Sequence, residues 1–502
     1  MNYKMKLIKN IGFLISMIAF GSCADLEIEN PNAPDRDRAL SNTADVLSLL
    51  KGSTTDLMFE ETNLYNVHID LAADQVTATN NYLSFWAHGD QPRRQLDNST
   101  TYADNAIYTS TWNQCNSTIS ISNIIISQIL NDGVVLFDDS EVDKTTEALA
   151  GAYFIRGLAQ TTIGMLYDQG YVVDENTDLG SLELQPYNLV LESGLASFDL
   201  ALEVLEGSNV GWEFYPTAQF DNTTFKQIVN SYAARAMISM PRTKAEAATL
   251  DYSKILSYAN NGLTTDFMPI GEAGVIYHNA IDWEETIVAS GAGYIPTDQK
   301  IPHLFDSDDQ PADYPTDANT ILPPAVSNDA RLEAYYTYTS DFGYLNPARR
   351  RALFSNYYLD RWPYLGQDFD YSLAPIPYFL KYEIDYIKAE CQLMLGSNAQ
   401  ALSLINGSAR SEVGGLSSSS NDSKESIEHL LFYEYSIELA TTGKGIQLYF
   451  MRRHDLLQKG TPLHYPVPAQ ELELLGLSVY TYGGEANADG VNTADGSGAW
   501  NK

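Results

Sequence analysis

Basic residues are scarce in this chain of 502 residues. It has 30 lysines and arginines against 65 aspartates and glutamates, which gives a formal net charge of −35 at pH 7. A surface this acidic repels a phosphate backbone, and no long tract of lysine or arginine offsets the repulsion. We therefore expect no nucleic-acid partner, and we interpret the acidity as a hydrated surface that favours solubility.

Cysteines are also few: there are three, too few for a fold that depends on a disulfide framework. Cys115 and Cys391 each fall within an apolar stripe of helical spacing, with no cysteine or histidine nearby that would complete a metal-binding pattern. We expect both to be buried, unreactive thiols. The sequence leaves open a disulfide between them.

Motifs that carry chemistry are missing as well. The chain contains no HExxH, GxxxxGK[ST], GxSxG or CxxC motif, and its seven histidines never occur at metal-ligand spacing. Acidic turns at 306–309 and 489–496 offer oxygen ligands for calcium but lack the spacing of a recognised calcium loop. We expect no catalytic residue, cofactor or metal site, although 65 carboxylates keep a surface glycoside hydrolase as an alternative.

No hydrophobic run is long enough to remain in a bilayer as a helix. The apolar stretch from Ile11 to Phe20 is shorter than the roughly 18 to 20 residues that a transmembrane helix needs. It follows Lys4, Lys6 and Lys9 and ends at Gly-Ser-Cys, which is the layout of a signal peptide.

Cys23 distinguishes this signal peptide from an ordinary secretory one. The small residues Gly21 and Ser22 before it resemble the bacterial lipobox, in which the cysteine is acylated and becomes the first residue of the mature protein. Acyl chains anchor a protein through buried methylenes, at about 0.8 kcal/mol each. We expect a lipoprotein signal peptide over 1–22, a lipid anchor on Cys23 and a tether over 23–45, with an ordinary signal peptide as the alternative.

Helical periodicity dominates the rest of the chain. Apolar residues at spacings of three and four predict helices over about 108–129, 148–166, 225–240 and 380–394, a short helix over 251–263, and another that begins near Ile427. Small residues such as Ala233 and Ala236 favour close packing between paired helices, as in tetratricopeptide-like hairpins.

A segment rich in Pro, Gly, Asp and Tyr, from about 265 to 375, lacks long periodic runs and predicts loops and short strands. We expect a predominantly α fold over 46–502, in which one domain has a scaffold of tetratricopeptide-like helical hairpins with long loops and a few short strands.

Several short motifs allow a comparison with a known family. Asn30-Pro31-Asn32 follows the predicted acylated cysteine, Asp74 lies in LAADQ, and the run AYFIRGLAQ occupies 152–160. In the last third, Glu383 and Glu390 lie seven residues apart in one predicted helix. These features resemble the SusD/RagB family of outer-membrane nutrient-binding lipoproteins of Bacteroidota.

The end of the chain matches that family most closely. The features that resemble the family are Glu434 and Glu438 ahead of Gly443 and Gly445, the run RRHDLL at 452–457, Gly-Thr-Pro at 460–462 and Pro-Val-Pro-Ala at 466–469. The sequence departs from the family pattern at Tyr435, where an arginine is usual, and at Thr442, where an acidic residue is usual. We therefore expect a divergent member of the family.

The charges of Glu434 and Glu438 near the end of the chain have a structural interpretation. Glu434 and Glu438 lie one helical turn apart, so Arg452 or Arg453 is the expected partner that holds the last helix against the scaffold.

The family resemblance implies a role in binding rather than a reaction. Such proteins are similar to lids over a TonB-dependent, SusC-like transporter, to which they pass an oligosaccharide or, less often, a peptide. The resemblance implies a lipid-anchored, surface-exposed protein of the outer membrane. Other hypotheses stay open: capture of peptides or proteins, a surface hydrolase, and a helical-repeat adaptor that binds only proteins.

Candidate ligand residues come from the chemistry of sugar binding, which needs flat aromatic faces beside hydrogen-bonding groups. The chain has 33 tyrosines, and two aromatic clusters fall in predicted loops. We predict that Trp86 stacks on the ligand while Asp70 and Arg361 supply hydrogen bonds, with Trp362 and Tyr364 as further candidates. The alternative is that each tryptophan only fills loop packing.

Overall fold

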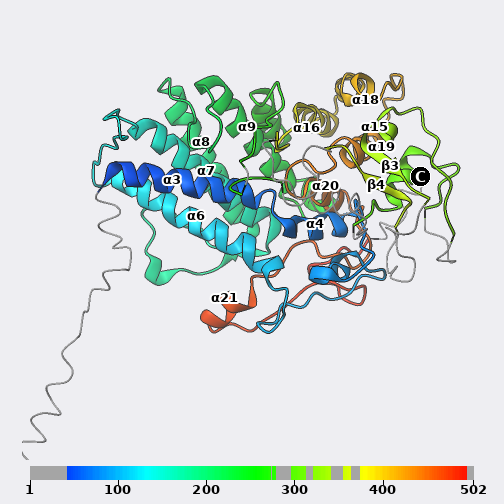
Figure 1. Ribbon diagram of the computed structural model, residues 1–502, viewed down its shortest axis with the longest axis horizontal. Coiled ribbons are helices and arrows are strands. Elements are labelled where there is room, and N and C mark those ends of the chain that lie inside the picture. Colours follow the sequence, from blue (N-terminus) through cyan, green and yellow to red (C-terminus); the bar gives the residue numbers. More distant parts are fainter. Residues whose placement is uncertain are drawn as a thin grey trace, which may run out of the picture.

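The structure is a computed structural model that describes residues 42–272, 274–278, 295–312, 320–340, 354–362 and 374–494. Long helices form the body of the molecule, and loops with short helices and strands gather at one end (Figure 1). Cys23 and Tyr364 lie outside the described residues.

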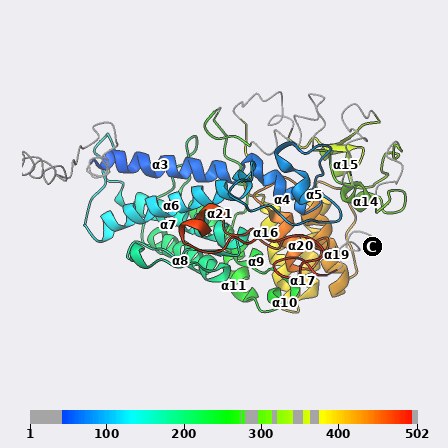
Figure 2. The ribbon, with the colours of Figure 1, turned by 90° about the horizontal axis from the view of Figure 1, so that it is seen from below.

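Four long helices stack side by side in chain order in the first half of the body (Figure 2). They are α3 (Thr43–Glu60), α6 (Ala106–Leu130), α7 (Thr145–Leu166) and α8 (Tyr187–Glu206). The side chains of α7 are buried without interruption from Ala150 to Leu166, so this helix lies at the centre of the stack. The Asn42 side chain begins α3 by accepting a hydrogen bond from the Ala44 backbone N–H at 3.2 Å.

Glycines allow α7 and α8 to approach closely. A Cβ atom on Gly157 would lie 3.0 Å from the Gly194 carbonyl oxygen, and one on Gly194 would lie 2.9 Å from the Gly157 oxygen. Two turns further along α7, a Cβ on Gly164 would meet the backbone of Leu191 at 2.8 Å. The two helices therefore pack backbone against backbone, an approach that only glycine permits at these positions.

Further helices continue the same pairwise stacking. These are α9 (Asn222–Ser239), α11 (Tyr252–Asn260), α16 (Lys381–Met394), α17 (Asn398–Asn406), α19 (Lys424–Ile437) and α20 (Ile446–Arg453). Each packs against the next one or two in this series, with α8 joining it to the first half. The predicted scaffold of helical hairpins is confirmed, and every helix expected from periodicity is present.

Short elements connect the hairpins and cover their ends. The short helices are η1 (Leu64–Asn66), α4 (Val67–Ala72), η2 (Tyr82–Ser84), α5 (Trp86–Gly89), η3 (Leu179–Ser181), α10 (Lys244–Ala247), α14 (Lys300–Phe305), α15 (Arg331–Tyr335), α18 (Ala409–Glu412) and α21 (Ala469–Leu474). Among the described residues, strands form antiparallel pairs: β1 (Gln169–Gly170) pairs with β2 (Gln185–Pro186), and β3 (Tyr336–Tyr338) pairs with β4 (Tyr357–Leu359).

The segment predicted to be rich in loops contains β3 and β4 among its described residues. Tyr336 pairs with Leu359 and Tyr338 with Tyr357. On the other side of β4, the Thr297 N–H donates to the Tyr357 carbonyl at 3.1 Å, and Thr297 in turn bridges to Val76. Extended segments from three distant parts of the chain thus lie side by side at the loop-rich end.

Two bidentate ion pairs fasten α16 to its neighbours. Glu383 accepts from Arg235 of α9 at 2.7 and 2.6 Å, and Glu390 accepts from Arg453 of α20 at 2.8 and 2.7 Å. All four side chains are nearly inaccessible to solvent. The prediction that Arg453 pairs with Glu434 or Glu438 is therefore wrong. Its guanidinium faces α16, where its partner Glu390 lies seven residues after Glu383.

Arg452 also differs from the prediction, because its partners are main-chain carbonyls. Its guanidinium donates to Ser239, Pro241 and Leu463, which places it at the C-terminal end of α9. Arg242 does the same at the end of α7, where it donates to Gly164 and Tyr167. A buried cation at a helix C-terminus satisfies unpaired carbonyls and is stabilised by the helix dipole.

The two described cysteines are buried and are not joined to each other. Burial raises the pKa of both thiols, so they stay protonated at neutral pH. This confirms that they are buried free thiols. Within the ranges that the structure describes, none of the helices has the length and apolar character needed to cross a membrane.

We predict that Glu390→Gln lowers the free energy of unfolding by about 3 to 5 kcal/mol at pH 7, because it leaves the Arg453 guanidinium buried without a carboxylate. Burial raises the pKa of Glu390, but Arg453 and His454 outweigh it and hold that pKa at about 2, below the ordinary 4.5. The contribution is therefore complete above about pH 4.5 and is lost as pH falls toward 2. Urea denaturation followed by circular dichroism at several pH values measures both effects.

The matched control is Glu412→Gln, which removes a carboxylate from the exposed pair with Lys381. Exposed pairs contribute about 1 kcal/mol or less, so this variant should unfold close to the wild type. Equal losses for the two variants would contradict a special role for the buried pair.

Candidate functional site

The predicted ligand residues near the start of the chain are partly accessible. Trp86 begins α5 and is half-buried, and its indole N–H donates to the Ala78 carbonyl at 3.2 Å. Asp70 lies half-buried on α4. Neither residue is fully enclosed, and both stay predictions as ligand contacts.

The two predicted residues after β4 are used in packing. Arg361 donates to the Glu438 carboxylate at 2.7 Å and to the Glu438 main-chain carbonyl, and its side chain is only 6% exposed. Trp362 is buried, and its indole N–H donates to the Thr441 hydroxyl at 2.9 Å. Their polar atoms therefore meet Glu438, directly after α19, and the loop that follows it, and as ligand contacts these two residues stay predictions.

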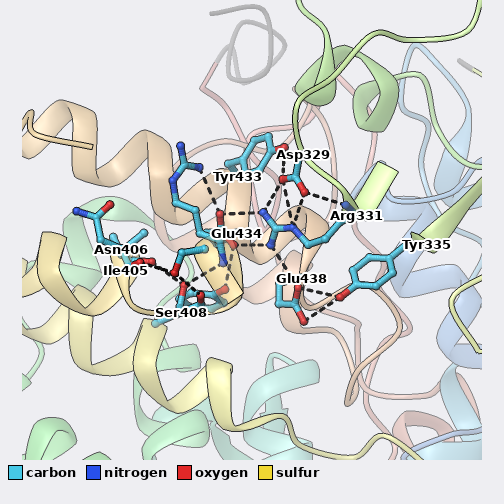
Figure 3. A network of polar contacts seen from close by, with 12 residues as sticks. Asp329, Arg331, Tyr335, Ile405, Asn406, Ser408, Tyr433, Glu434 and Glu438 are labelled. Atoms are coloured by element: carbon cyan, nitrogen blue, oxygen red, sulfur yellow. Dashed lines mark hydrogen bonds and ion pairs between the residues drawn. The ribbon is translucent and has the colours of Figure 1, made fainter. Parts of the chain in front are cut away.

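A buried charge network lies beneath this region, centred on Arg331 (Figure 3). Its guanidinium donates to both oxygens of Asp329, at 3.0 and 2.7 Å, and to Glu434 at 2.7 and 3.1 Å. A further bond reaches Glu438 at 3.2 Å. The partners of Glu434 and Glu438 are thus arginines of the loop-rich segment and α18, in place of the predicted Arg452 and Arg453.

The charges in this network balance. Its carboxylates are Asp329, Glu434 and Glu438, and its guanidinium groups are those of Arg331, Arg361 and Arg410. Burial lowers the pKa of Arg331, but the carboxylates of Glu434 and Asp329 outweigh it and raise that pKa above its ordinary value. Tyrosine hydroxyls complete the network by donating to the three carboxylates; they are Tyr335, Tyr386 and Tyr433.

This network fixes the hairpin of β3 and β4 on the helical scaffold. Arg331 belongs to α15, which runs directly into β3, and Arg361 comes two residues after β4. Both side chains meet carboxylates at the C-terminal end of α19, namely Glu434 in its last turn and Glu438 directly after it. Removing either cation would leave a buried carboxylate under-compensated, so the hairpin is held at both ends.

A pocket of about 610 Å³ lies on this hairpin. Tyrosine rings from both strands line it, together with the segment from Pro324 to Ala330 and with Glu333. The three rings are Tyr336, Tyr338 and Tyr357. We call this site the tyrosine pocket. Its volume is that of a small-molecule site, and its mixture of rings and polar groups fits a ligand that is both flat and hydrogen-bonding.

Hydrogen bonds set the tyrosine rings in place. The Tyr338 hydroxyl donates to the Leu322 carbonyl at 2.6 Å, and the Tyr357 hydroxyl accepts from the Ala325 N–H at 2.8 Å. The two rings meet edge to face, with centroids 5.3 Å apart. Burial raises the pKa of both phenols, so they are neutral at pH 7.

The accessible polar groups of the pocket come from Asn328 and Glu333, both of which are exposed. Of the two carboxylates that line it among the described residues, Asp329 is occupied by Arg331 and Tyr433. Acid and base catalysis of glycoside hydrolysis uses two carboxylates that flank the scissile bond. Asp329 is therefore not available as the second carboxylate of such a pair.

A second aromatic surface is the loop that precedes α5. Tyr82 is 50% exposed, while the next two residues, Leu83 and Ser84, have φ values of 46° and 56°. A positive φ strains the backbone of residues other than glycine, and such strain often accompanies a binding site. The Asn81 side chain holds the turn by accepting from the Trp86 N–H at 3.1 Å. We call residues 80–86 the aromatic loop.

Sequence reasoning missed the tyrosine pocket although a signal was available. Tyr336 and Tyr338 alternate along β3, which places both side chains on one face of a strand. No group of three or more His, Cys, Asp or Glu side chains is arranged for a metal ion anywhere in the described ranges.

We predict that Arg331→Met loosens the tyrosine pocket, because it leaves Asp329 and Glu434 buried without their main cation. Hydrogen exchange of amides in 324–338 should become at least about tenfold faster, since an opening energy lowered by about 1.4 kcal/mol has that effect. Exchange measured by mass spectrometry tests this. Lys381→Met, which breaks an exposed pair, is the control, and unchanged exchange in Arg331→Met would contradict the proposed anchoring.

Comparisons with known proteins identify solved structures with a similar fold. No family model matches the chain, and no curated protein matches it in sequence. Solved structures do match: a SusD superfamily protein from Parabacteroides distasonis has a TM-score of 0.59 at 12% identity, covering 86% of this chain and 98% of its own. A SusD superfamily protein from Bacteroides vulgatus has a TM-score of 0.58 at 12% identity, covering 86% and 97%.

A third similar structure is a SusD-like carbohydrate binding protein from Bacteroides fragilis, with a TM-score of 0.56 at 14% identity, covering 82% of this chain and 86% of its own. The shared features extend over most of both chains in each case. The fold inferred from the sequence motifs is confirmed: this chain has the fold of the SusD superfamily.

Proposed function

We propose that this protein binds carbohydrate and performs no chemistry on it, with the tyrosine pocket as its binding site. The observation that carries the proposal is the tyrosine pocket itself: neutral phenol rings and exposed amide and carboxylate groups, mounted on a hairpin that buried ion pairs hold in place. Flat rings suit the apolar faces of sugars, and Asn328 and Glu333 suit their hydroxyls.

The comparisons support the same ligand class. Similar structures from Bacteroides vulgatus and Bacteroides fragilis are described as SusD-like carbohydrate binding proteins. A binding role, in place of hydrolysis, agrees with the single accessible carboxylate among the described residues of the pocket.

We further propose that the protein is anchored to the outer surface of the outer membrane by acylated Cys23. There it delivers its ligand to a TonB-dependent, SusC-like transporter. The support is the lipobox-like sequence Gly21-Ser22-Cys23 after a short apolar run, together with the SusD fold.

Tyr338→Ala should weaken binding of oligosaccharides by about tenfold or more, because it removes a half-buried ring face from the pocket. Tyr338→Phe keeps that face and should stay within about threefold of the wild type. Affinity-gel electrophoresis and calorimetry of protein lacking residues 1–23, against a panel of plant, fungal and host glycans, measure this.

Tyr382→Ala on α16 is the matched control, because it removes a half-buried tyrosine that lies outside the pocket. Loss of binding in Tyr338→Ala alone supports the assignment. Equal binding of glycans by all variants would exclude the tyrosine pocket as the binding site. In a parallel screen of peptides, binding of peptides but of no glycan would favour the peptide alternative. Release of shortened sugars would refute a purely binding role.

Cys23→Ala should abolish fatty-acid labelling of the protein and release it from the membrane fraction, because the acyl chains are its proposed anchor. Metabolic labelling with palmitate in a bacterial host that processes lipoproteins tests this. Cys115→Ala is the control, since Cys115 is buried and should not be labelled. Labelling that persists in Cys23→Ala would overturn the proposed anchor.

A further inference from the structure

A second pocket, of about 500 Å³, lies between α3 and α6. Residues from the end of α3 line one side and residues from the first half of α6 line the other; they are Asp56, Phe59, Glu60, Asn63, Ser110, Asn113, Gln114 and Ser117. We call it the α3–α6 pocket. No lysine, arginine or histidine is among these residues, so the chemistry of the pocket disfavours an anionic ligand.

The floor of this pocket is fully hydrogen-bonded. Glu60 accepts from Ser110 at 2.9 Å, from Thr111 at 2.5 Å and from Lys444 at 3.2 Å. Its charge is therefore compensated from below. Above Glu60 the pocket is lined by amide and hydroxyl side chains, of which Asn113 and Ser117 are exposed and can form further hydrogen bonds.

One wall of the pocket is aromatic. The Phe59 ring is half-buried and packs against Tyr277 with ring centroids 5.1 Å apart. An aromatic face beside carboxamides, hydroxyls and a carboxylate is the mixture that neutral sugars need, since a sugar ring has an apolar face and a rim of hydroxyls.

The position of the pocket connects it to the aromatic loop. Ser84 of that loop donates to Asp104 at 2.5 Å, just before α6 begins, and Ser110 of α6, six residues further along the chain, donates to Glu60. At a rise of 1.5 Å per residue, these two attachments are about 9 Å apart along the helix axis. Tyr65 is close to both attachments, because burial and the nearby charges of Asp104 and Glu60 raise the pKa of its phenol.

We propose that the α3–α6 pocket is a second carbohydrate subsite, which receives the continuation of a chain that also contacts Tyr82 of the aromatic loop. This proposal rests on the proposed carbohydrate binding and deepens it. It implies that the protein selects neutral oligosaccharides of several units over short sugars, because only a longer chain contacts both surfaces.

Asn113→Arg tests the subsite. Asn113 is exposed on α6, so an arginine there is compatible with the helix and places a long charged side chain in the pocket. Ser120→Arg is the matched control, exposed on the same helix two turns away and outside the pocket lining. The probes are linear neutral gluco- and manno-oligosaccharides of two to seven units, titrated calorimetrically into protein lacking residues 1–23.

The affinity of the wild type should rise with chain length, and Asn113→Arg should lose about tenfold for the longest probes while binding the shortest unchanged. Ser120→Arg should match the wild type throughout. Wild-type binding that Asn113→Arg leaves intact at every length overturns the second subsite but keeps carbohydrate binding. Absence of binding by the wild type to every probe in both series overturns the subsite and counts against the proposed function itself.

Discussion

The buried guanidinium of Arg331 is the constraint on which the loop-rich end of the molecule depends. It meets Asp329 of its own segment and two carboxylates at the C-terminal end of α19, in a site that solvent does not reach. A charge buried in this way is tolerated only when it is paired and hydrogen-bonded, so the sequence must place these groups together or lose the fold of the segment. Because Arg361 meets the same helix, the hairpin of β3 and β4 is held at both ends.

That anchoring explains how a loop-rich segment can present a defined site. A hairpin of two three-residue strands is too small to be stable by itself. Here the strands are supported by neighbouring extended segments and by the ion pairs beneath, so the tyrosine rings lie at set positions. A site that does not have to be ordered when ligand arrives loses less entropy on binding, which suits a protein whose proposed task is capture.

Much of the fold followed from residue spacing alone. The stripe from Tyr108 to Ile129 predicted α6, and its members are buried as far as Ile126, together with neighbours on the same face such as Thr111 and Ile125. The unpredicted α8 carries a similar signal in Val190, Leu195 and Phe198. Residue spacing could not predict the ion-pair partners. Glu434 and Arg331 are 103 residues apart in sequence, and the one-turn spacing of Glu434 and Glu438 does not indicate which distant arginine pairs with them.

The site was harder to predict than the scaffold for the same reason. Trp362 looked like an exposed loop aromatic, but its indole N–H meets Thr441, which lies 79 residues away. Conversely, Tyr338 and Tyr357 line one pocket only because β3 and β4 pair, and pairing of short strands has a weak sequence signal. Family motifs predicted the fold correctly, but they carry no information about residues that contact a ligand.

The most direct test of the account is a crystal structure of the protein lacking residues 1–23, grown with the oligosaccharide that it binds most tightly. The account predicts a sugar ring against Tyr338, with hydroxyls bonded to groups of the segment from 327 to 333. A ligand bound elsewhere, with the tyrosine pocket empty, would contradict the assignment of the site.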